Sequence, residues 1–296
     1  MSNQLKGHSL ALFTVIVWGT TLFASDYLLN TANLSTSAVV MARFVIAYVI
    51  LNIMYPPRLK LQAVKTEITF ALAGLTGVTL YFIGENTALL STRPANVSII
   101  IATAPMFTSL FYRLTDKTMK LNKLFYLGFV VAMGGIVITT LSEGELGLSP
   151  KGDIIALVAA IAWAIYSVMI GRLNSLGINQ IQMMRRVFFW GVVYLIPYMI
   201  ISGFSISEYA AFSDIHAVLD VLYLGIVASA LCYVTWNYAM KCLTPVIGSS
   251  YIYAQPVVAI IVAALKNMTL TWHIFVGAAL TIMGLVISVQ KPKTNE

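Results

Sequence analysis

The chain has 296 residues, of which 59% are hydrophobic and only 10% are charged. Soluble globular domains carry about 25% charged residues, so this composition excludes a soluble enzyme, a disordered chain and a nucleic-acid-binding domain. The formal net charge of +7 does not change that conclusion, because so few charges on so apolar a chain indicate a membrane before a nucleic acid. We therefore expect a lipid bilayer, and no nucleic acid, as the surroundings of this protein.

Ten apolar stretches are long enough for helices that cross a bilayer, which takes about 20 residues each. Barrel strands would alternate apolar and polar residues over about ten positions, whereas the run from Ile154 to Ile170 is continuously apolar. We therefore predict an all-α integral membrane protein with ten transmembrane helices. They are expected at residues 8–29, 36–55, 67–90, 94–114, 122–141, 151–171, 180–203, 218–240, 245–265 and 270–290.

The segments between these stretches are short, so they leave no room for a soluble domain. The longest is about 203–217, which could hold at most a short surface helix. The first apolar run continues from Trp18 to Leu29 without a small-residue cleavage motif, so we interpret it as a retained helix and not as a signal peptide.

The placement of the basic residues predicts the orientation. If the N-terminus is cytoplasmic, twelve basic residues outside the spans face the cytoplasm and three face outward. The positive-inside rule favours this arrangement, with both termini in the cytoplasm. The twelve are Lys6, Arg58, Lys60, Lys65, Arg113, Lys117, Lys120, Lys123, Arg172, Lys241, Lys291 and Lys293, and the three are Arg93, Lys151 and Lys266.

The two halves of the chain, residues 1–145 and 146–296, align as an internal repeat. At an offset of 151 the matched pairs include Gly74/Gly225, Asn86/Asn237, Pro94/Pro245 and Pro105/Pro256. Each half holds five predicted helices, an odd number, so the second repeat enters the membrane from the opposite side. Inverted repeats are typical of secondary transporters, whose substrate site lies near the membrane midplane where the repeats meet.

Several short motifs add a family resemblance over essentially the whole chain. They are Trp18-Gly19-Thr20-Thr21, Ala42-Arg43-Phe44, Glu85-Asn86-Thr87-Ala88-Leu89, Ala95-Asn96-Val97-Ser98, Trp236-Asn237-Tyr238-Ala239 and Tyr251-Ile252-Tyr253-Ala254-Gln255-Pro256. In these the sequence resembles the EamA type of the drug/metabolite transporter superfamily. The resemblance implies small-metabolite transport across the bacterial inner membrane, often export of amino acids or related compounds. Asp26 stands where relatives often have Lys, which leaves the preferred substrate charge open.

Charged residues inside predicted spans are candidates for function, because they are costly in a bilayer. Counting along the helices places Asp26, Arg43 and Glu85 at similar depth in the outer half. We predict that Arg43 pairs with Glu85, with Asp26 nearby, as an ion pair that takes part in gating. The alternative is a static structural pair. Glu85 is also the natural proton carrier if protons are the coupling ion.

In the inner half, Arg185 and Arg186 lie about two turns into their helix, and the sequence matches no acid to them. We predict that Arg185 attracts a substrate carboxylate. The alternative is that these side chains extend to the membrane interface.

Aromatic and amide residues near mid-membrane predict a binding cavity. Trp18 and Trp163 are repeat mates, while Tyr81 shares a helix face with Glu85. Rings with a few hydrogen-bonding groups suit an amphipathic solute, although packing or an interfacial belt also explains a single aromatic residue. The predicted substrate-binding residues are Trp18, Tyr81, Glu85, Trp163, Arg185, Trp236, Asn237, Tyr251 and Gln255, the last two on one face of one helix.

Two kinds of residue predict helix geometry. Pro105 and Pro256 lie deep in their spans, where each should bend its helix as a gating joint or as a fixed bend. Glycines spaced seven apart, at 128 and 135 and at 277 and 284, should permit close helix packing, within the bundle or between protomers.

These observations together predict a secondary transporter that works by alternating access, with no catalytic residues, cofactor or metal site. A facilitative uniporter or a channel-like pore is the first alternative, although no repeated filter motif is visible. An intramembrane enzyme is the second, but the sequence lacks HExxH, paired-aspartate and GxSxG motifs.

Overall fold

Helices make up all the regular secondary structure in the part of the chain that the computed structural model describes, which is residues 3–60, 63–115, 123–141, 150–243, 250–268 and 271–288. The all-α prediction is therefore confirmed for these residues. The α-helices are α1 (Asn3–Asp26), α2 (Thr36–Met54), α3 (Val64–Gly74), α4 (Tyr81–Leu89), α5 (Pro94–Ile101), α6 (Ala104–Thr115), α7 (Lys123–Leu141), α8 (Pro150–Asn174), α9 (Gln180–Ile201), α10 (Ile215–Leu222), α11 (Cys232–Cys242), α13 (Gln255–Leu265) and α14 (Trp272–Ser288).

Seven helical stretches in the described residues are long and apolar enough to cross a membrane. They are Asn3–Thr31, Thr36–Met54, Val64–Leu89, Pro94–Thr115, Pro150–Asn174, Gln180–Ile201 and Ile215–Cys242. At the other three expected spans the structure has shorter apolar helices, at Lys123–Gly135, Tyr251–Leu265 and Trp272–Gly284. A multi-span membrane protein is thus confirmed, while the count of ten transmembrane helices stays a prediction.

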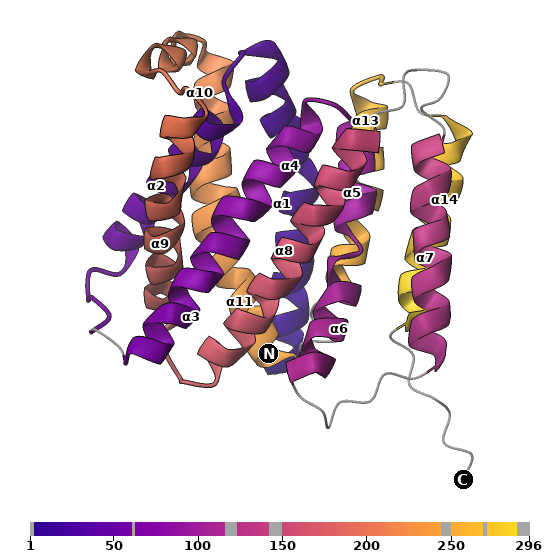
Figure 1. Cartoon of the computed structure of the whole chain (residues 1–296), viewed down its shortest axis with the longest axis horizontal. Coiled ribbons are helices and arrows are strands. Elements are labelled where there is room, and N and C mark those ends of the chain that lie inside the picture. The colour runs from indigo at the N-terminus through magenta and orange to yellow at the C-terminus, as the bar shows by residue number, and fades with distance from the viewer. Residues whose placement is uncertain are drawn as a thin grey trace.

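Most helices stand side by side, and the N-terminal end of α1 marks one end of the bundle (Figure 1). Successive spans run in opposite directions, so the described members of the twelve basic residues predicted to face the cytoplasm all lie at this same end. We call it the basic end. These basic residues are Lys6, Arg58, Lys60, Lys65, Arg113, Lys123, Arg172 and Lys241. Lys117, Lys120, Lys291 and Lys293 lie outside the described residues, as does Pro245 of the repeat alignment.

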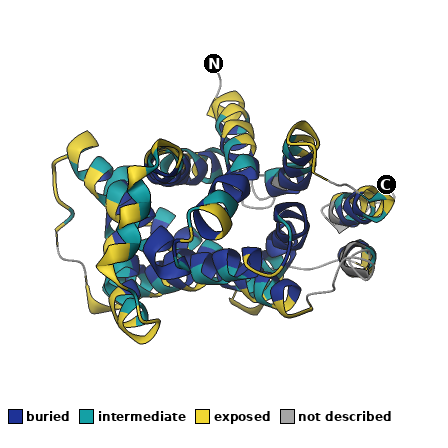
Figure 2. Cartoon of the chain, turned by 90° about the horizontal axis from the view of Figure 1, so that it is seen from above, coloured by how far each residue is buried: buried dark blue, intermediate teal, exposed yellow. Residues whose placement is uncertain are grey.

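Buried residues gather in the middle of the bundle and exposed residues lie on its rim (Figure 2). The core is formed where α1 packs on α11 and where α4 and α6 pack on α8. Its fully buried side chains include Phe44, Tyr166, Phe188 and Tyr233. The exposed rim is apolar, as expected for a surface that lipid covers.

Two of the long spans are interrupted by π-helical segments at corresponding places. Leu75–Leu80 joins α3 to α4, and Tyr223–Leu231 joins α10 to α11. A π-helical turn inside an α-helix is rare and is frequent at functional sites. Each segment ends directly before a helix that carries predicted site residues, α4 with Glu85 and α11 with Trp236.

Each of the two prolines lies at an interruption of its span and not within an unbroken α-helix. The helix of α5 stops at Ile101, and α6 begins at Ala104 with Pro105 as its second residue. In the other half a 3₁₀ turn, Ser250–Ala254, precedes α13, whose second residue is Pro256. A proline is tolerated in the first turn because the N–H it lacks has no partner there. Each proline therefore begins a new helix after a break.

The spaced glycines bring α7 and α14 together within the chain. A Cβ atom on Gly135 would lie 2.6 Å from the Gly277 carbonyl oxygen, and one on Gly284 would lie 2.5 Å from that of Gly128. The Thr281 hydroxyl donates to the Ala132 carbonyl across the same contact at 3.3 Å. Close packing was predicted, and the structure shows that it occurs inside the bundle.

The longest connection holds a short 3₁₀ helix, Ile206–Ser213, as expected for a surface segment. Ser205 and Glu208 form a capping box at its start. Glu208 also accepts a hydrogen bond of 2.9 Å from the backbone N–H of Ser35, which precedes α2. This carboxylate therefore ties the connection to the end of the bundle opposite the basic end.

Candidate functional site

A small cavity lies at the centre of the bundle, lined by residues from both halves of the chain. Its volume is about 20 Å³, enough for about one water molecule. Predicted residues that line it are Trp18, Arg43, Tyr81, Glu85, Trp163 and Gln255, joined by Thr21, Phe82, Ile101, Tyr233 and Ile252, which were not predicted. We call it the central cavity.

Arg43 enters the central cavity from α2 and is only 1% exposed. Its Nε donates a hydrogen bond of 2.6 Å to the Ser229 hydroxyl, which the π-helical segment of the other half supplies. The guanidinium carbon lies 4.1 Å from the centre of the Phe82 ring, a favourable cation–π distance. Both terminal nitrogens are buried without a hydrogen-bond partner, so the guanidinium keeps free donors.

Glu85 presents the opposite charge from α4 and is 3% exposed. Its Oε2 accepts a hydrogen bond of 2.6 Å from the hydroxyl of Tyr81, one turn earlier on the same face. Its Oε1 is buried and has no partner. The shared face of Tyr81 and Glu85 is thus as expected, and the carboxylate keeps one free acceptor.

The expected pair between Arg43 and Glu85 is not a direct salt bridge in the described residues, although the two charges lie close enough to interact electrostatically. In the described chain, neither residue makes an ion pair, because Ser229 and Phe82 hold the guanidinium while Tyr81 holds the carboxylate. Asp26 does not line the central cavity. It accepts a hydrogen bond from Asn30, four residues along the same helical stretch.

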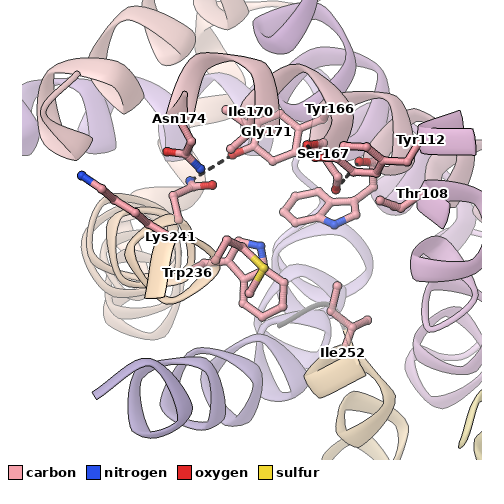
Figure 3. Close-up of a pocket in the computed structure, with 13 residues that line it drawn as sticks. Thr108, Tyr112, Tyr166, Ser167, Ile170, Gly171, Asn174, Trp236, Lys241 and Ile252 are labelled. Carbon is pink, nitrogen blue, oxygen red and sulfur yellow. Dashed lines mark hydrogen bonds between the residues drawn. The ribbon is translucent and has the colours of Figure 1, made fainter. Parts of the chain in front are cut away.

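A second cavity, of about 110 Å³, extends from the core toward the basic end. Figure 3 shows its lining, with Asn174 and Lys241 at one side and Trp236 and Ile252 below. We call it the inner cavity. Trp163 and Ile252 line both cavities, so these two side chains form the partition between them.

Aromatic rings form the core around both cavities. The Trp18 ring centre lies 5.3 Å from that of Trp163, its repeat mate, in an edge-on arrangement, and 5.1 Å from that of Trp236. Tyr166 and Tyr233 complete the group and were not predicted. The signal was available, because each lies three residues from a predicted tryptophan and so shares its helix face.

Asn237 lines the inner cavity, and its amide is anchored by its own helix. Its Nδ2 donates to the Tyr233 carbonyl at 2.7 Å and to the Tyr166 hydroxyl at 3.2 Å, while its Oδ1 has no partner. Asn86, its repeat mate, donates in the same way to the Phe82 carbonyl at 2.8 Å. The matched asparagines therefore make matched contacts.

Two of the predicted substrate-binding residues, Arg185 and Tyr251, line neither cavity. Arg185 donates to the carbonyl oxygens of Tyr55 and Pro57 at 2.8 and 2.6 Å, which fixes the segment after α2. Tyr251 hydrogen-bonds His8 at 2.8 Å. Because Tyr251 lies on the 3₁₀ turn before α13, it does not share one continuous helix face with Gln255, and only Gln255 lines the central cavity.

The two inner arginines were expected to lack an acid, which was wrong for Arg186, whereas Arg185 makes no ion pair with a described residue. Arg186 forms an ion pair with Glu67, with Nη2 and Oε1 2.7 Å apart. Glu67 lies in the first turn of α3. It is the first residue of the predicted span 67–90, so it was not counted among the charged residues inside the spans.

The fold and the site define a class: a multi-pass membrane protein with a buried cavity between its helices that contains two charged residues. A family model, the EamA-like transporter family, matches residues 5–141 and again residues 150–290. The chain belongs to this family. It is therefore a transporter of the inner membrane, which agrees with the resemblance seen in its sequence motifs.

Relatives named as transporters match the chain along most of its length. An uncharacterized transporter of Archaeoglobus fulgidus is 26% identical over 97% of this chain and 98% of its own. The inner membrane transporter YedA of Escherichia coli K12 is 28% identical over 64% of this chain and 60% of its own. A probable terminal-alkyne amino-acid exporter of Streptantibioticus cattleyicolor is 25% identical over 73% and 71%.

A solved crystal structure also superposes on this one. It covers 96% of this chain and 97% of its own with a TM-score of 0.68, at 18% sequence identity. This likeness shows the fold alone.

Proposed function

We propose that the protein is a secondary transporter that exports a small zwitterionic, amphipathic metabolite, such as an amino acid, by alternating access. One observation carries the proposal. Arg43 and Glu85 face one buried cavity with opposite charges, and each keeps polar atoms without a partner. Buried groups of this kind are costly unless something satisfies them. A solute carboxylate suits the free guanidinium nitrogens, and a solute ammonium suits the free carboxylate oxygen.

The aromatic lining supplies the amphipathic part of this chemistry. Rings of Trp18, Trp163 and Tyr233 line the cavity beside the two charged residues. In a transport state in which the cavity is wider than the about 20 Å³ of this structure, an apolar side group of the solute would pack among them. The exporter relative from Streptantibioticus cattleyicolor is named for an amino-acid cargo, which is in keeping with a zwitterion.

Alternating access is supported by matched features of the two halves. Helix breaks precede Pro105 and Pro256, π-helical segments precede α4 and α11, and one family model matches each half. Interrupted helices at equivalent places of two repeats are the pointer to a binding site in transporters with inverted repeats. We propose that residues 1–145 and 146–296 are such repeats and that the breaks are the joints between inward-open and outward-open states.

The orientation follows from the basic end, which the positive-inside rule places in the cytoplasm. The inner cavity is then the cytoplasmic entrance, and Trp163 with Ile252 separates it from the central cavity. A solute arriving from the cytoplasm passes this partition to reach Arg43 and Glu85. We propose protons as the coupling ion, with Glu85 as their carrier, since its carboxylate lies on the same route.

Exchange in proteoliposomes tests this function. Liposomes preloaded with an unlabelled amino acid are diluted into the labelled compound, and the label should accumulate transiently above its outside concentration. Equilibration without such an overshoot contradicts alternating access and indicates a channel-like pore, while a chemically changed product indicates an enzyme. An imposed pH gradient should drive net flux, and its failure to do so leaves facilitated diffusion.

A further inference from the structure

A third cavity, of about 250 Å³, lies at the basic end on the opposite edge of the bundle from α7 and α14. It is formed by the end of α2, the segment that follows it and the start of α9. Three arginines line it, Arg58, Arg185 and Arg186, with Gln182 as a further polar group. This headgroup cavity, as we call it, shares no lining residue with the central or inner cavity.

The headgroup cavity carries an excess of positive charge. Glu67 neutralises Arg186 through three hydrogen bonds, the shortest 2.7 Å. Arg185 is only 6% exposed, yet its hydrogen bonds go to backbone carbonyls and not to a carboxylate. Arg58 is exposed, and neither arginine forms an ion pair with a described residue. A nearly buried guanidinium without a counter-charge is costly, so the cavity suits an anion.

The walls of the cavity are held in place. Gln182 donates to the Pro57 carbonyl at 3.1 Å, the same oxygen that Arg185 binds. Tyr48 of α2 and Phe189 of α9 bridge the two helices, with ring centres 6.5 Å apart. These contacts fix Arg185 and the backbone next to Arg58.

An apolar surface continues from the cavity along both helices. Exposed side chains follow one face of α2 at a spacing of four and continue on the neighbouring face of α9, and α2 packs against α9. They are Val45, Val49 and Ile53 on α2, and Phe189, Ile196 and Ile200 on α9. A phosphate anion in solution would make no use of this surface, whereas acyl chains of a lipid would lie against it.

We propose that this cavity binds the phosphate of an anionic phospholipid in the leaflet at the basic end, with the acyl chains along the seam of α2 and α9. Basic pockets between membrane helices recognise such headgroups in general. The site is independent of the transport site, because its ligand touches neither Arg43 nor Glu85.

Native mass spectrometry of the delipidated protein tests the proposal, with phosphatidylglycerol, phosphatidylethanolamine or inorganic phosphate added in separate arms. The wild type should retain phosphatidylglycerol in preference to the net-neutral phosphatidylethanolamine. Arg58→Gln should bind phosphatidylglycerol about fivefold more weakly, the share of one basic residue near an anionic surface. Arg58 has no described hydrogen bond, so this variant should fold normally.

Arg172→Gln is the matched control, because Arg172 is an exposed arginine at the same end that does not line the cavity. It should bind phosphatidylglycerol as the wild type does. Equal loss in both variants, or equal binding of both lipids, would overturn the proposal, and binding of inorganic phosphate in place of the lipid would assign the cavity to a soluble anion. None of these results depends on transport activity.

Discussion

Arg43 and Glu85 face the same buried cavity, yet each is held by a different neighbour: Arg43 by Ser229 and Glu85 by Tyr81. Two opposite charges that were free to meet would satisfy each other and leave nothing for a solute. The unpartnered atoms of the two residues are the observation on which the proposed zwitterionic ligand rests.

Selectivity among analogues should separate the roles of the two charges. Arg43→Gln should weaken binding of an amino acid about 10–100-fold, which corresponds to the free energy of hydrogen bonds to a charged group. It should barely affect binding of the decarboxylated amine. Glu85→Gln should weaken binding of the compounds that carry an ammonium group, the amino acid and its decarboxylated amine, and should barely affect the deaminated acid. Ligand-induced thermal shifts measure both series. Equal losses for every analogue would show that the residues serve the fold and not recognition.

The prolines that begin α6 and α13 should matter for movement more than for binding. Pro105→Ala and Pro256→Ala each restore a backbone N–H at the break and favour a continuous helix. We expect exchange in proteoliposomes to slow severalfold while the thermal shift with substrate is kept. Pro197→Ala is the control, since Pro197 lies inside α9, exposed and away from the cavities. If exchange slowed in Pro197→Ala but not in Pro105→Ala and Pro256→Ala, the assignment of the joints would be contradicted.

Adjacent glycines on α7 offer a matched test of helix packing. Gly135→Ala places a methyl group against Thr281 and the Gly277 carbonyl, so it should destabilise the protein by about 1–3 kcal/mol. Gly134→Ala meets nothing within 4 Å and should be neutral or stabilising by up to about 1 kcal/mol, because alanine favours a helix. Thermal unfolding in detergent compares the two. Equal Tm values would argue against the contact of α7 with α14.

Stability should depend on pH through Asp214, which precedes α10. A hydrogen bond of 2.6 Å from the Tyr27 hydroxyl, followed by one from the backbone N–H of His216, holds the pKa of Asp214 below its usual range. A carboxylate with a lowered pKa stabilises the fold above about pH 4, and this stabilisation is lost as the pH falls through the lowered value.

Tyr27→Phe should therefore lower the Tm at pH 6, and its difference from the wild type should shrink at acidic pH. Tyr238→Phe is the control, because Tyr238 is 37% exposed and its hydroxyl has no described hydrogen bond. A Tyr27→Phe effect that is the same at every pH would separate the hydrogen bond from the ionisation of Asp214.

The sequence was enough to place the seven long apolar helices and to predict most of the residues that line the central cavity's charged face, because hydrophobic length and helix periodicity need no side-chain detail. It could not show how side chains share their contacts. The hydroxyl of Ser229 comes from a π-helical turn that the residue pattern does not predict, and it accepts a hydrogen bond from Arg43. In the same way a 3₁₀ turn separates Tyr251 from Gln255, where the pattern alone fits one continuous helix.

The most direct test of the central claim is exchange of a labelled amino acid in proteoliposomes, measured for the wild type, Arg43→Gln and Glu85→Gln at matched protein density. The wild type should show a transient overshoot of label that the deaminated and decarboxylated analogues do not produce. Each variant should lose the overshoot for the amino acid. Overshoot that persists unchanged in both variants would contradict the assignment of this charged cavity as the site of transport.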